Sequence, residues 1–595
     1  MSKEKTRQAK TVKKTKADKS ADDAQRQPSS WRYGLVVIVM LSCAVFLSYR
    51  ALSIQVLNNG FLLSQGDARH LRTISLPAHR GMLLDRNGEV LALSSPVTTV
   101  WADPSHVDLQ HAALSKLADI IHMPVDEIRS EISKHRNKEF VYLQRQLNPS
   151  VGEQVKALKI PGISTLREFK RYYPAGEVTS QLVGISNVDE QGVEGLELAE
   201  NKELKGRPGK DRVLQDRRGH IIDSVDLLEE PQPGKDVRLS IDKRLQYIAY
   251  RELQKSVKLN NATKASLVLL DSQSGQVLAM TNYPSYNPNN LNGVKTGNIR
   301  NRAATDLFEP GSTMKPFVVA AGLDTKQLSP DIILDTSPGY IRVGHATIHD
   351  VRNHGVLDLT QIIQKSSNVG MTKIVLTLPD EMLWEKLSDM GFGQLTKSNF
   401  PGEVAGYLPF YGEWSDIVKA TLSFGYGVSV TPLQLAQAYS IFANDGVLNP
   451  ITLLKNDRIV RGRRVLSSGV SHEVLKMMES VVSREGTAWD AHIPGYHVAG
   501  KTGTVRKVVK GGGYSNDDYM AVFAGIAPAS HPRLVAVVVV DDPKNKYYYG
   551  GKVAAPVFAN VMSEALRLLN IAPDDLDSNN VRVASASDGG HWHVQ

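Results

Sequence analysis

Residues 309–317 read Glu-Pro-Gly-Ser-Thr-Met-Lys-Pro-Phe, and this segment contains the clearest local signal in the chain. The Pro-Gly pair marks a turn, and Pro316 is tolerated only in the first turn of a helix. The segment therefore predicts Ser312 at a helix N-terminus, with Lys315 one turn further on the same face. A lysine whose pKa is lowered by desolvation can take the proton of a serine nucleophile. Taken alone, Ser-x-x-Lys more often marks a helix cap followed by a surface lysine.

Two further motifs follow in the chain. Ser366-x-Asn368 begins 54 residues after Ser312, directly behind a helical pattern over residues 359–364. A Lys-Thr-Gly motif begins 189 residues after Ser312, at Lys501, in a segment that is typical of a strand. Ser-x-x-Lys, Ser-x-Asn and Lys-Thr-Gly in this order resemble the signature set of penicillin-binding proteins and serine β-lactamases. The combination favours an acyl-transfer site over a simple helix cap.

The chemistry of these side chains suggests a catalytic role for each of them. We expect Ser312 to attack an acyl carbonyl and form an acyl-enzyme, with Lys315 as the base. Ser366 can relay the proton to the leaving amine, and Asn368 can orient the substrate and the base. No cofactor is needed for this chemistry.

The third motif is expected to bind the substrate. Lys501 would place a positive charge near a substrate carboxylate, and the hydroxyls of Thr502 and Thr504 would bond the same group. Gly503 would let the strand approach the substrate closely. The backbone N–H groups of Ser312 and Thr504 would form an oxyanion hole.

The chain is long enough for several domains, and its charge is unevenly distributed. Of 595 residues, 42% are hydrophobic and 22% are charged. Residues 1–32 hold ten basic and four acidic residues, which leaves only +2 of the net +8 for the remainder. Because a nucleic-acid-binding protein would carry its basic patch on a folded face, we expect no nucleic-acid partner. The only cysteine, Cys43, excludes an intrachain disulfide and a cysteine-based metal site.

A membrane anchor is predicted near the start of the chain. Tyr33–Tyr49 contains no charge, and with the apolar residues that follow it reaches the length that spans a bilayer of roughly 30 Å. No signal-peptide cleavage site is evident, so we expect an uncleaved anchor over residues 33–52. The basic segment before it predicts a cytoplasmic N-terminus and places the rest of the chain across the inner membrane.

Two alternative site chemistries are disfavoured. Residues 495–502 fit the P-loop pattern, and a strand pattern ending at Asp541 resembles its partner strand. A P-loop must open a helix after its Lys-Thr, whereas this segment continues as a strand on the side of the membrane away from nucleotide. His345 and His349 lie four residues apart but in a strand or loop, so we expect no metal site.

Composition and turn signals predict five segments. These are a basic disordered tail (1–32), the membrane anchor (33–52), a non-catalytic pedestal (53–234), a catalytic domain (235–572) and a polar C-terminal tail (573–595). Strands at both ends of the catalytic segment, with helices between them, predict an α+β fold in which helices flank an antiparallel sheet. An amphipathic helix capped by Asp242 should open the domain.

The whole chain resembles the class B penicillin-binding proteins, and within them the division transpeptidases of the FtsI type from Gram-negative bacteria. The resemblance rests on the three motifs and on segments outside them, which are residues 80–88, 192–197, 278–280, 286–289, 424–427 and 549–551. It implies an elongated, β-rich pedestal followed by a β-lactamase-like transpeptidase domain. It also implies Tyr426 as a substrate contact.

The resemblance further implies a reaction and partners. The family cross-links peptidoglycan stem peptides through a serine acyl-enzyme during septal wall synthesis, and β-lactams trap the same serine. A membrane-embedded glycan polymerase of the FtsW type and other divisome proteins are the implied partners, at the division septum. An elongation-type transpeptidase and a D,D-carboxypeptidase share the motifs and stay open as alternatives. A β-lactamase is disfavoured because no glutamate over residues 381–485 has Asn four residues on.

Overall fold

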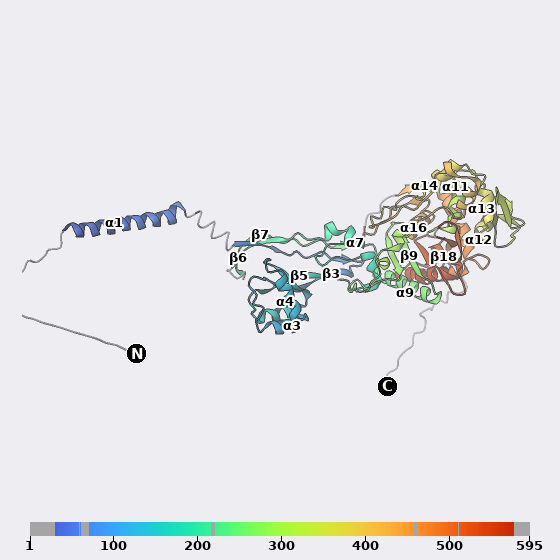
Figure 1. Ribbon diagram of the computed structural model, residues 1–595. Helices are drawn as coiled ribbons and strands as arrows, with labels where there is room; N and C mark the ends of the chain where they lie inside the picture. Colours follow the sequence, from blue (N-terminus) through green and yellow to red (C-terminus); the bar gives the residue numbers. More distant parts are fainter. Residues whose placement is uncertain are drawn as a thin grey trace, which may run out of the picture. The chain divides into compact units, whose positions relative to one another are not determined.

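The computed structural model describes residues 30–58, 60, 71–215, 221–456, 462–509 and 511–575. They belong to two compact units (Figure 1). The first contains Met1–Ile74 and Arg212–Asp226, and the second contains Ser75–Asp211 and Leu227–Gln595. Most of the predicted basic tail and residues 576–595 of the predicted C-terminal tail lie outside the described residues.

The first unit contains the apolar helix that the sequence predicts. Helix α1 (Ser30–Leu52) continues into a π-helical turn, Ser53–Leu57. Within Trp31–Val56, an 18-residue window reaches a mean hydropathy of 2.2, and the helix is long and apolar enough to cross a membrane. Strands β1 (Leu71–Leu76), β6 (Gly209–Gln215) and β7 (Ile221–Glu229) form a three-stranded sheet in the order β1-β6-β7, most of which lies in this unit.

The N-terminal part of the second unit is organised around one long strand, β3 (Val90–Ala102). It pairs along most of its length with β5 (Ile163–Tyr172), and at either end with β4 (Val141–Leu147) and β2 (Leu83–Leu84). Strand β2 in turn pairs with β8 (Val237–Arg238). Three helices form a small core against the far end of β3: α3 (Leu114–Ile121), α4 (Val125–Lys134) and α5 (Pro149–Ala157).

Two segments that carried the family resemblance meet in this pedestal. Arg80 and Glu197 form a fully buried ion pair at 2.7 Å. Arg171, on β5, bonds the other carboxylate oxygen of Glu197 at 2.6 Å. Removing one member of such a buried set leaves an uncompensated charge, so these residues fix how the segments pack.

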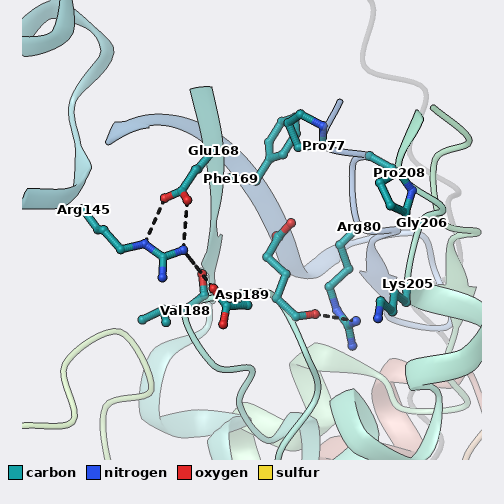
Figure 2. Close-up of a pocket in the computed structure, with 12 residues that line it drawn as sticks. Pro77, Arg80, Arg145, Glu168, Phe169, Val188, Asp189, Lys205, Gly206 and Pro208 are labelled. Atoms are coloured by element: carbon teal, nitrogen blue, oxygen red, sulfur yellow. Dashed lines mark hydrogen bonds and ion pairs between the residues drawn. The ribbon is translucent and has the colours of Figure 1, made fainter. Parts of the chain in front are cut away.

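A cavity of about 220 Å³ opens beside this ion cluster and is shown in Figure 2. Arg145 lies between Glu168 and Asp189, bonding them at 3.0 and 2.9 Å. No residue of the three sequence motifs lines this cavity. This cavity is therefore not part of the acyl-transfer site.

Polar contacts join the pedestal to the catalytic domain within the second unit. The backbone of Tyr173 exchanges two hydrogen bonds with the side-chain amide of Asn289, at 3.0 and 2.9 Å. Ser180 bonds Ser285 through their hydroxyls at 2.8 Å. The segment that follows β10 is thus held by both parts of the unit.

The catalytic domain is built on an antiparallel sheet of five strands in the order β10-β9-β19-β18-β17. Their bounds are β9 (Lys264–Asp271), β10 (Val277–Tyr283), β17 (Ala499–Val508), β18 (Tyr514–Ala527) and β19 (Leu534–Asp541). Every residue of β19 is buried, so both faces of the sheet are covered. The predicted antiparallel sheet is confirmed, with its first and last strands side by side.

Helices α9 (Lys243–Leu259) and α19 (Ala555–Leu568) pack against each other and against the sheet. The predicted cap is present, because the Asp242 carboxylate accepts from the Arg244 backbone at 2.9 Å. Helix α16 (Pro432–Ser440) packs on β9, β18 and β19.

The remaining short elements connect these layers. The helices are α6 (Ser180–Val183), α7 (Gly195–Ala199), α8 (Asn201–Leu204), α10 (Arg302–Thr305), α11 (Lys315–Asp324), α12 (Leu359–Lys365), α13 (Asn368–Val375), α14 (Asp380–Asp389), α15 (Asp416–Leu422), α17 (Ser468–Glu479) and α18 (Gly550–Val553). The strands are β11 (Ile333–Asp335), β12 (Tyr340–Val343), β13 (Ala346–His349), β14 (Val356–Asp358), β15 (Val447–Leu448) and β16 (Arg463–Arg464).

Candidate active site

Ser312 lies on a tight turn rather than inside a helix. A 3₁₀ turn, Gly311–Met314, precedes α11, which begins at Lys315 and has Pro316 in its first turn. The helical run thus begins with a 3₁₀ turn at the predicted position, and the chain enters it through Gly311, whose φ is +59°. Ser312 is half-buried, and among the described residues its hydroxyl has no hydrogen-bond partner.

The turn is held by close backbone approaches. Gly425 lies so near that a Cβ on it would be 2.1 Å from the Gly311 carbonyl oxygen. The Gly311 N–H also donates to the Gly425 carbonyl at 3.2 Å. Only glycine fits at such a contact.

Lys315 is completely buried and points to the second motif. Its Nζ donates to the Ser366 carbonyl at 2.5 Å, to the Ser366 hydroxyl at 3.2 Å and to Asn368 Oδ1 at 2.8 Å. These three acceptors hold the Lys315 side chain in position. They do not replace all of the water that burial removes from a charged ammonium. The structure thus brings Lys315 and Asn368 into contact.

The second motif sits at a junction of two helices. Helix α12 ends at Lys365, and the next residue, Ser366, has a left-handed φ of +59° that is uncommon for a residue other than glycine. Ser367 caps α13, and its hydroxyl accepts from the Gly370 backbone at 2.9 Å. The sharp reversal at Ser366 turns its hydroxyl toward the two lysines of the site.

Lys501 approaches the same hydroxyl from the edge strand β17. Its side chain is fully buried, and its Nζ donates to Ser366 Oγ at 2.9 Å. Strand β17 runs through the whole Lys-Thr-Gly motif, which is incompatible with a phosphate-binding loop that opens a helix.

The two lysines share an environment that disfavours their charged forms. Burial, reinforced by the nearby Lys501, holds the pKa of Lys315 well below its usual range, while Asp350 acts in the opposite direction. Burial also lowers the pKa of Lys501 to about 7. Burial and the neighbouring Lys501 charge therefore both favour the neutral form of Lys315.

The glycine of the third motif has a role that the sequence did not predict. A Cβ on Gly503 would lie 2.8 Å from the Pro310 carbonyl oxygen and 3.2 Å from the Thr313 methyl carbon. Gly503 therefore lets β17 pack closely against the turn of Gly311–Met314, which we call the nucleophile turn after the expected role of Ser312. This contact is additional to any approach to substrate.

The two threonines of the third motif are each anchored by a neighbour. The hydroxyls of Thr502 and Thr487 are 2.9 Å apart. The Thr504 hydroxyl accepts from the Gly550 backbone at 3.0 Å. Thr487 could not be predicted from the sequence, because it belongs to no motif and meets Thr502 only through the fold.

Tyr426 lies in an aromatic wall beside the nucleophile turn. Its ring packs edge-on against Tyr514 at 5.1 Å and near Phe424 at 6.0 Å between centroids. Glu309 joins this wall to the turn, because it accepts from the Gly427 backbone at 2.8 Å and the Tyr514 hydroxyl at 3.1 Å.

Asp350 is a further residue that sequence reasoning missed. It follows β13 and reaches the second motif, where its carboxylate accepts from the Ser367 hydroxyl at 2.6 Å and the Val369 backbone at 3.0 Å. An aspartate after a short strand has no distinctive pattern, so nothing in the sequence pointed to it.

Comparisons with known proteins match both parts of the second unit. The family description "Penicillin binding protein transpeptidase domain" matches residues 265–563, and "Penicillin-binding Protein dimerisation domain" matches residues 75–239. The chain is 43% identical to the peptidoglycan D,D-transpeptidase FtsI of Escherichia coli K12, covering 93% of this chain and 94% of that protein. It is 41% identical to a probable peptidoglycan D,D-transpeptidase, PbpC, of Pseudomonas aeruginosa, covering 93% and 98%.

Solved structures agree with the fold. Penicillin-binding protein 3 of Mycobacterium tuberculosis, in complex with aztreonam, is 28% identical with a TM-score of 0.66. The match covers 84% of this chain and 98% of that one. The transpeptidase domain of penicillin-binding protein 3 from Burkholderia pseudomallei is 42% identical with a TM-score of 0.52, covering 56% and 97%.

Proposed function

The chain belongs to the class B penicillin-binding proteins and is a peptidoglycan D,D-transpeptidase, and on this premise we propose that Ser312 is its acylated nucleophile. The observation that carries the proposal is the position of Ser312. Its hydroxyl is unpartnered among the described residues, on a turn that leads directly into the buried Lys315. Such a hydroxyl is free to attack an acyl carbonyl.

Lys315 is the base in this proposal. Its environment disfavours the ammonium, so a neutral amine is available to take the Ser312 proton as the Oγ–C bond forms. Asn368 and Ser366 hold the amine in place through the hydrogen bonds described above. The lone pair of Lys315 is thereby kept at the start of α11, next to the nucleophile turn.

Ser366 delivers the proton to the leaving group. A hydroxyl has one proton and two lone pairs, and here both lysines donate to its oxygen. Its own O–H is therefore free to donate to the amine of the terminal D-Ala as the C–N bond breaks. Lys315 then replaces the proton on Ser366, so that the acyl-enzyme forms without a net change of charge. An acceptor amine from a neighbouring stem peptide reverses these steps.

The third motif binds the substrate and its developing charge. The backbone N–H groups of Ser312 and Thr504 form the oxyanion hole in this proposal, supported by the close packing of Gly503 on Pro310. Lys501 and the hydroxyls of Thr502 and Thr504 face the substrate carboxylate, and Tyr426 contributes an aromatic contact. β-Lactams acylate the same serine.

The membrane helix makes the chain a single-pass membrane protein, and we extend this to a topology and partners. The N-terminus is cytoplasmic and the catalytic domain periplasmic, because the basic residues precede the span. The proposed segments are 1–32, 33–52, 53–234, 235–572 and 573–595. At the division septum, the anchor contacts a membrane-embedded glycan polymerase of the FtsW type. Small residues in the span, Gly34, Ser42 and Ala44, would permit close helix contact.

The catalytic proposal is tested by acyl transfer with the full-length protein in detergent. A peptide ending in D-Ala-D-Ala is supplied as donor with an amine acceptor, and both D-Ala release and the joined product are measured. Wild-type protein should form both, and Ser312→Ala neither. Joined product at the wild-type rate in Ser312→Ala would remove Ser312 from the mechanism.

The partner proposal is tested separately by replacing residues 33–52 with an unrelated membrane-spanning helix. Penicillin acylation should be unchanged, whereas complementation of septal cross-linking in cells should fail at native abundance. Full complementation would show that the anchor is only a tether.

A further inference from the structure

Asp350 is attached to the Ser-x-Asn motif at several points although it lies in a different part of the fold. It follows the two-stranded ribbon of β12 and β13, and its backbone N–H donates to the Gly339 carbonyl at 2.9 Å. Its carboxylate accepts from the Ser367 hydroxyl and from the backbone N–H groups of Asn368 and Val369, the first two residues of α13. The ribbon is thus clamped to the start of that helix.

The same ribbon determines which way the Asn368 amide faces. The Asn368 amide nitrogen donates to the His349 carbonyl at 3.1 Å, while its oxygen accepts from Lys315 at 2.8 Å. A carbonyl accepts only and an ammonium donates only, so these two neighbours allow a single orientation of the amide. His349 and Asp350 therefore hold the backbone and the side chain of Asn368 together.

The Asp350 carboxylate also affects the pKa of the buried Lys315. The charged or titratable groups around Lys315 are Lys501 on β17, Asp350 and the half-buried His354 that follows the ribbon. Lys501 disfavours the ammonium of Lys315, and Asp350 favours it. His354 is itself subject to Asp350, Arg352 and Lys365, and burial lowers its pKa.

We propose that Asp350 is a positioning residue of the transpeptidase: it orients Asn368 toward Lys315 and supplies the negative charge that acts on the buried Lys315. This inference rests on the proposed role of Lys315 as the base. It differs from simple helix capping, because a cap would stabilise α13 without affecting the protonation of Lys315.

The test compares the pH dependence of penicillin acylation in the full-length protein and in Asp350→Asn. Asparagine is nearly the same size and can still accept a hydrogen bond, but it carries no charge. We expect acylation to slow by about tenfold or more as Asn368 loosens. Because the negative charge that favours the ammonium is gone, the pH of half-maximal rate should fall by about half a unit or more. Thermal unfolding confirms that the variant is folded.

Asp358→Asn is the matched control. Asp358 is likewise an aspartate that caps a helix, since it accepts from the Gln361 backbone at 2.7 Å at the start of α12. It belongs to neither the lysine cluster nor the motifs. Its replacement should leave the rate within about twofold and the midpoint unchanged.

A rate within twofold of wild type with an unchanged midpoint, or a midpoint that rises, would overturn the proposal. Should Asp350→Asn fail to fold, Ser367→Ala serves instead, because it removes one hydrogen bond to Asp350 and keeps the charge. It should slow acylation without moving the midpoint, and a wild-type rate would count against the proposal. If wild-type protein itself shows no rise of the rate with pH, the proposed base fails instead.

Discussion

Lys315 and Lys501 donate to the same atom, the hydroxyl oxygen of Ser366, at 3.2 and 2.9 Å. One lysine comes from the start of α11 and the other from the edge strand β17, and both are fully buried. A single serine therefore joins the three motifs through hydrogen bonds, although they are far apart in sequence.

The base assignment predicts a strong effect of Lys315→Arg. A guanidinium does not give up its proton in proteins, so acylation by a labelled penicillin should fall by about 10²–10⁴-fold. The wild-type rate should rise as the pH increases through the depressed pKa of Lys315, and this rise should disappear in the variant. Stopped-flow acylation across pH measures both effects.

Lys476→Arg, on the exposed side of α17, is the control and should behave as wild type. Acylation by Lys315→Arg within a few-fold of wild type would place the base elsewhere.

The burial of Lys501 should lower the stability of the protein, although we expect the residue to be needed for activity. Its pKa is about 7 when folded and near 10.5 when unfolded, so the unfolded chain binds the extra proton between these values. The resulting destabilisation is greatest below pH 7 and diminishes as the pH rises toward 10.5. Lys501→Met should therefore raise the free energy of unfolding by about 1–3 kcal/mol at pH 6.5. The gain in unfolding free energy of Lys501→Met should be smaller at pH 9.5. Acylation should be impaired at both pH values.

Denaturant unfolding at the two pH values provides the measurement. A variant that is less stable than wild type at pH 6.5, or whose advantage grows with pH, contradicts the account.

Gly503→Ala should separate β17 from the nucleophile turn. The added methyl would meet the Pro310 carbonyl oxygen at 2.8 Å and side-chain carbons of Thr313 and Val522 at 3.2 Å, so it has little room. We expect acylation to slow by about tenfold or more, since misplacing the oxyanion donors is costly. Gly469→Ala, in helix α17 with nothing within 4 Å of the new methyl, is the control and should retain full acylation. Equal rates in the two variants would show that the close approach of Gly503 is not needed.

Local patterns were sufficient to predict several elements and the motif residues. The helix cap at Asp242 and the strand that ends at Asp541 are confirmed. These features depend on neighbours in sequence, where spacing and propensity act directly. The Pro-Gly pair before Ser312 and Pro316 after it likewise predicted a helix start, and the 3₁₀ turn that leads into α11 lies there.

Contacts between distant segments could not be predicted in the same way. Asp350, which follows the β12–β13 ribbon, reaches Asn368 at the start of α13, and Thr487 meets Thr502 only because its loop packs against strand β17. Gly503 was expected to face the substrate, but its nearest backbone neighbour is Pro310. Neither the residue type nor the spacing at these positions encodes such partners.

The most direct test of the account is to map the adduct that a labelled penicillin forms with the full-length protein. After the reaction, proteolysis and mass spectrometry locate the modified residue, with Ser312→Ala treated in parallel and shown to be folded by thermal unfolding. The account predicts one covalent adduct, on Ser312, that is absent from the variant. An adduct on Ser366 or any other residue, or one that persists in Ser312→Ala, would contradict it.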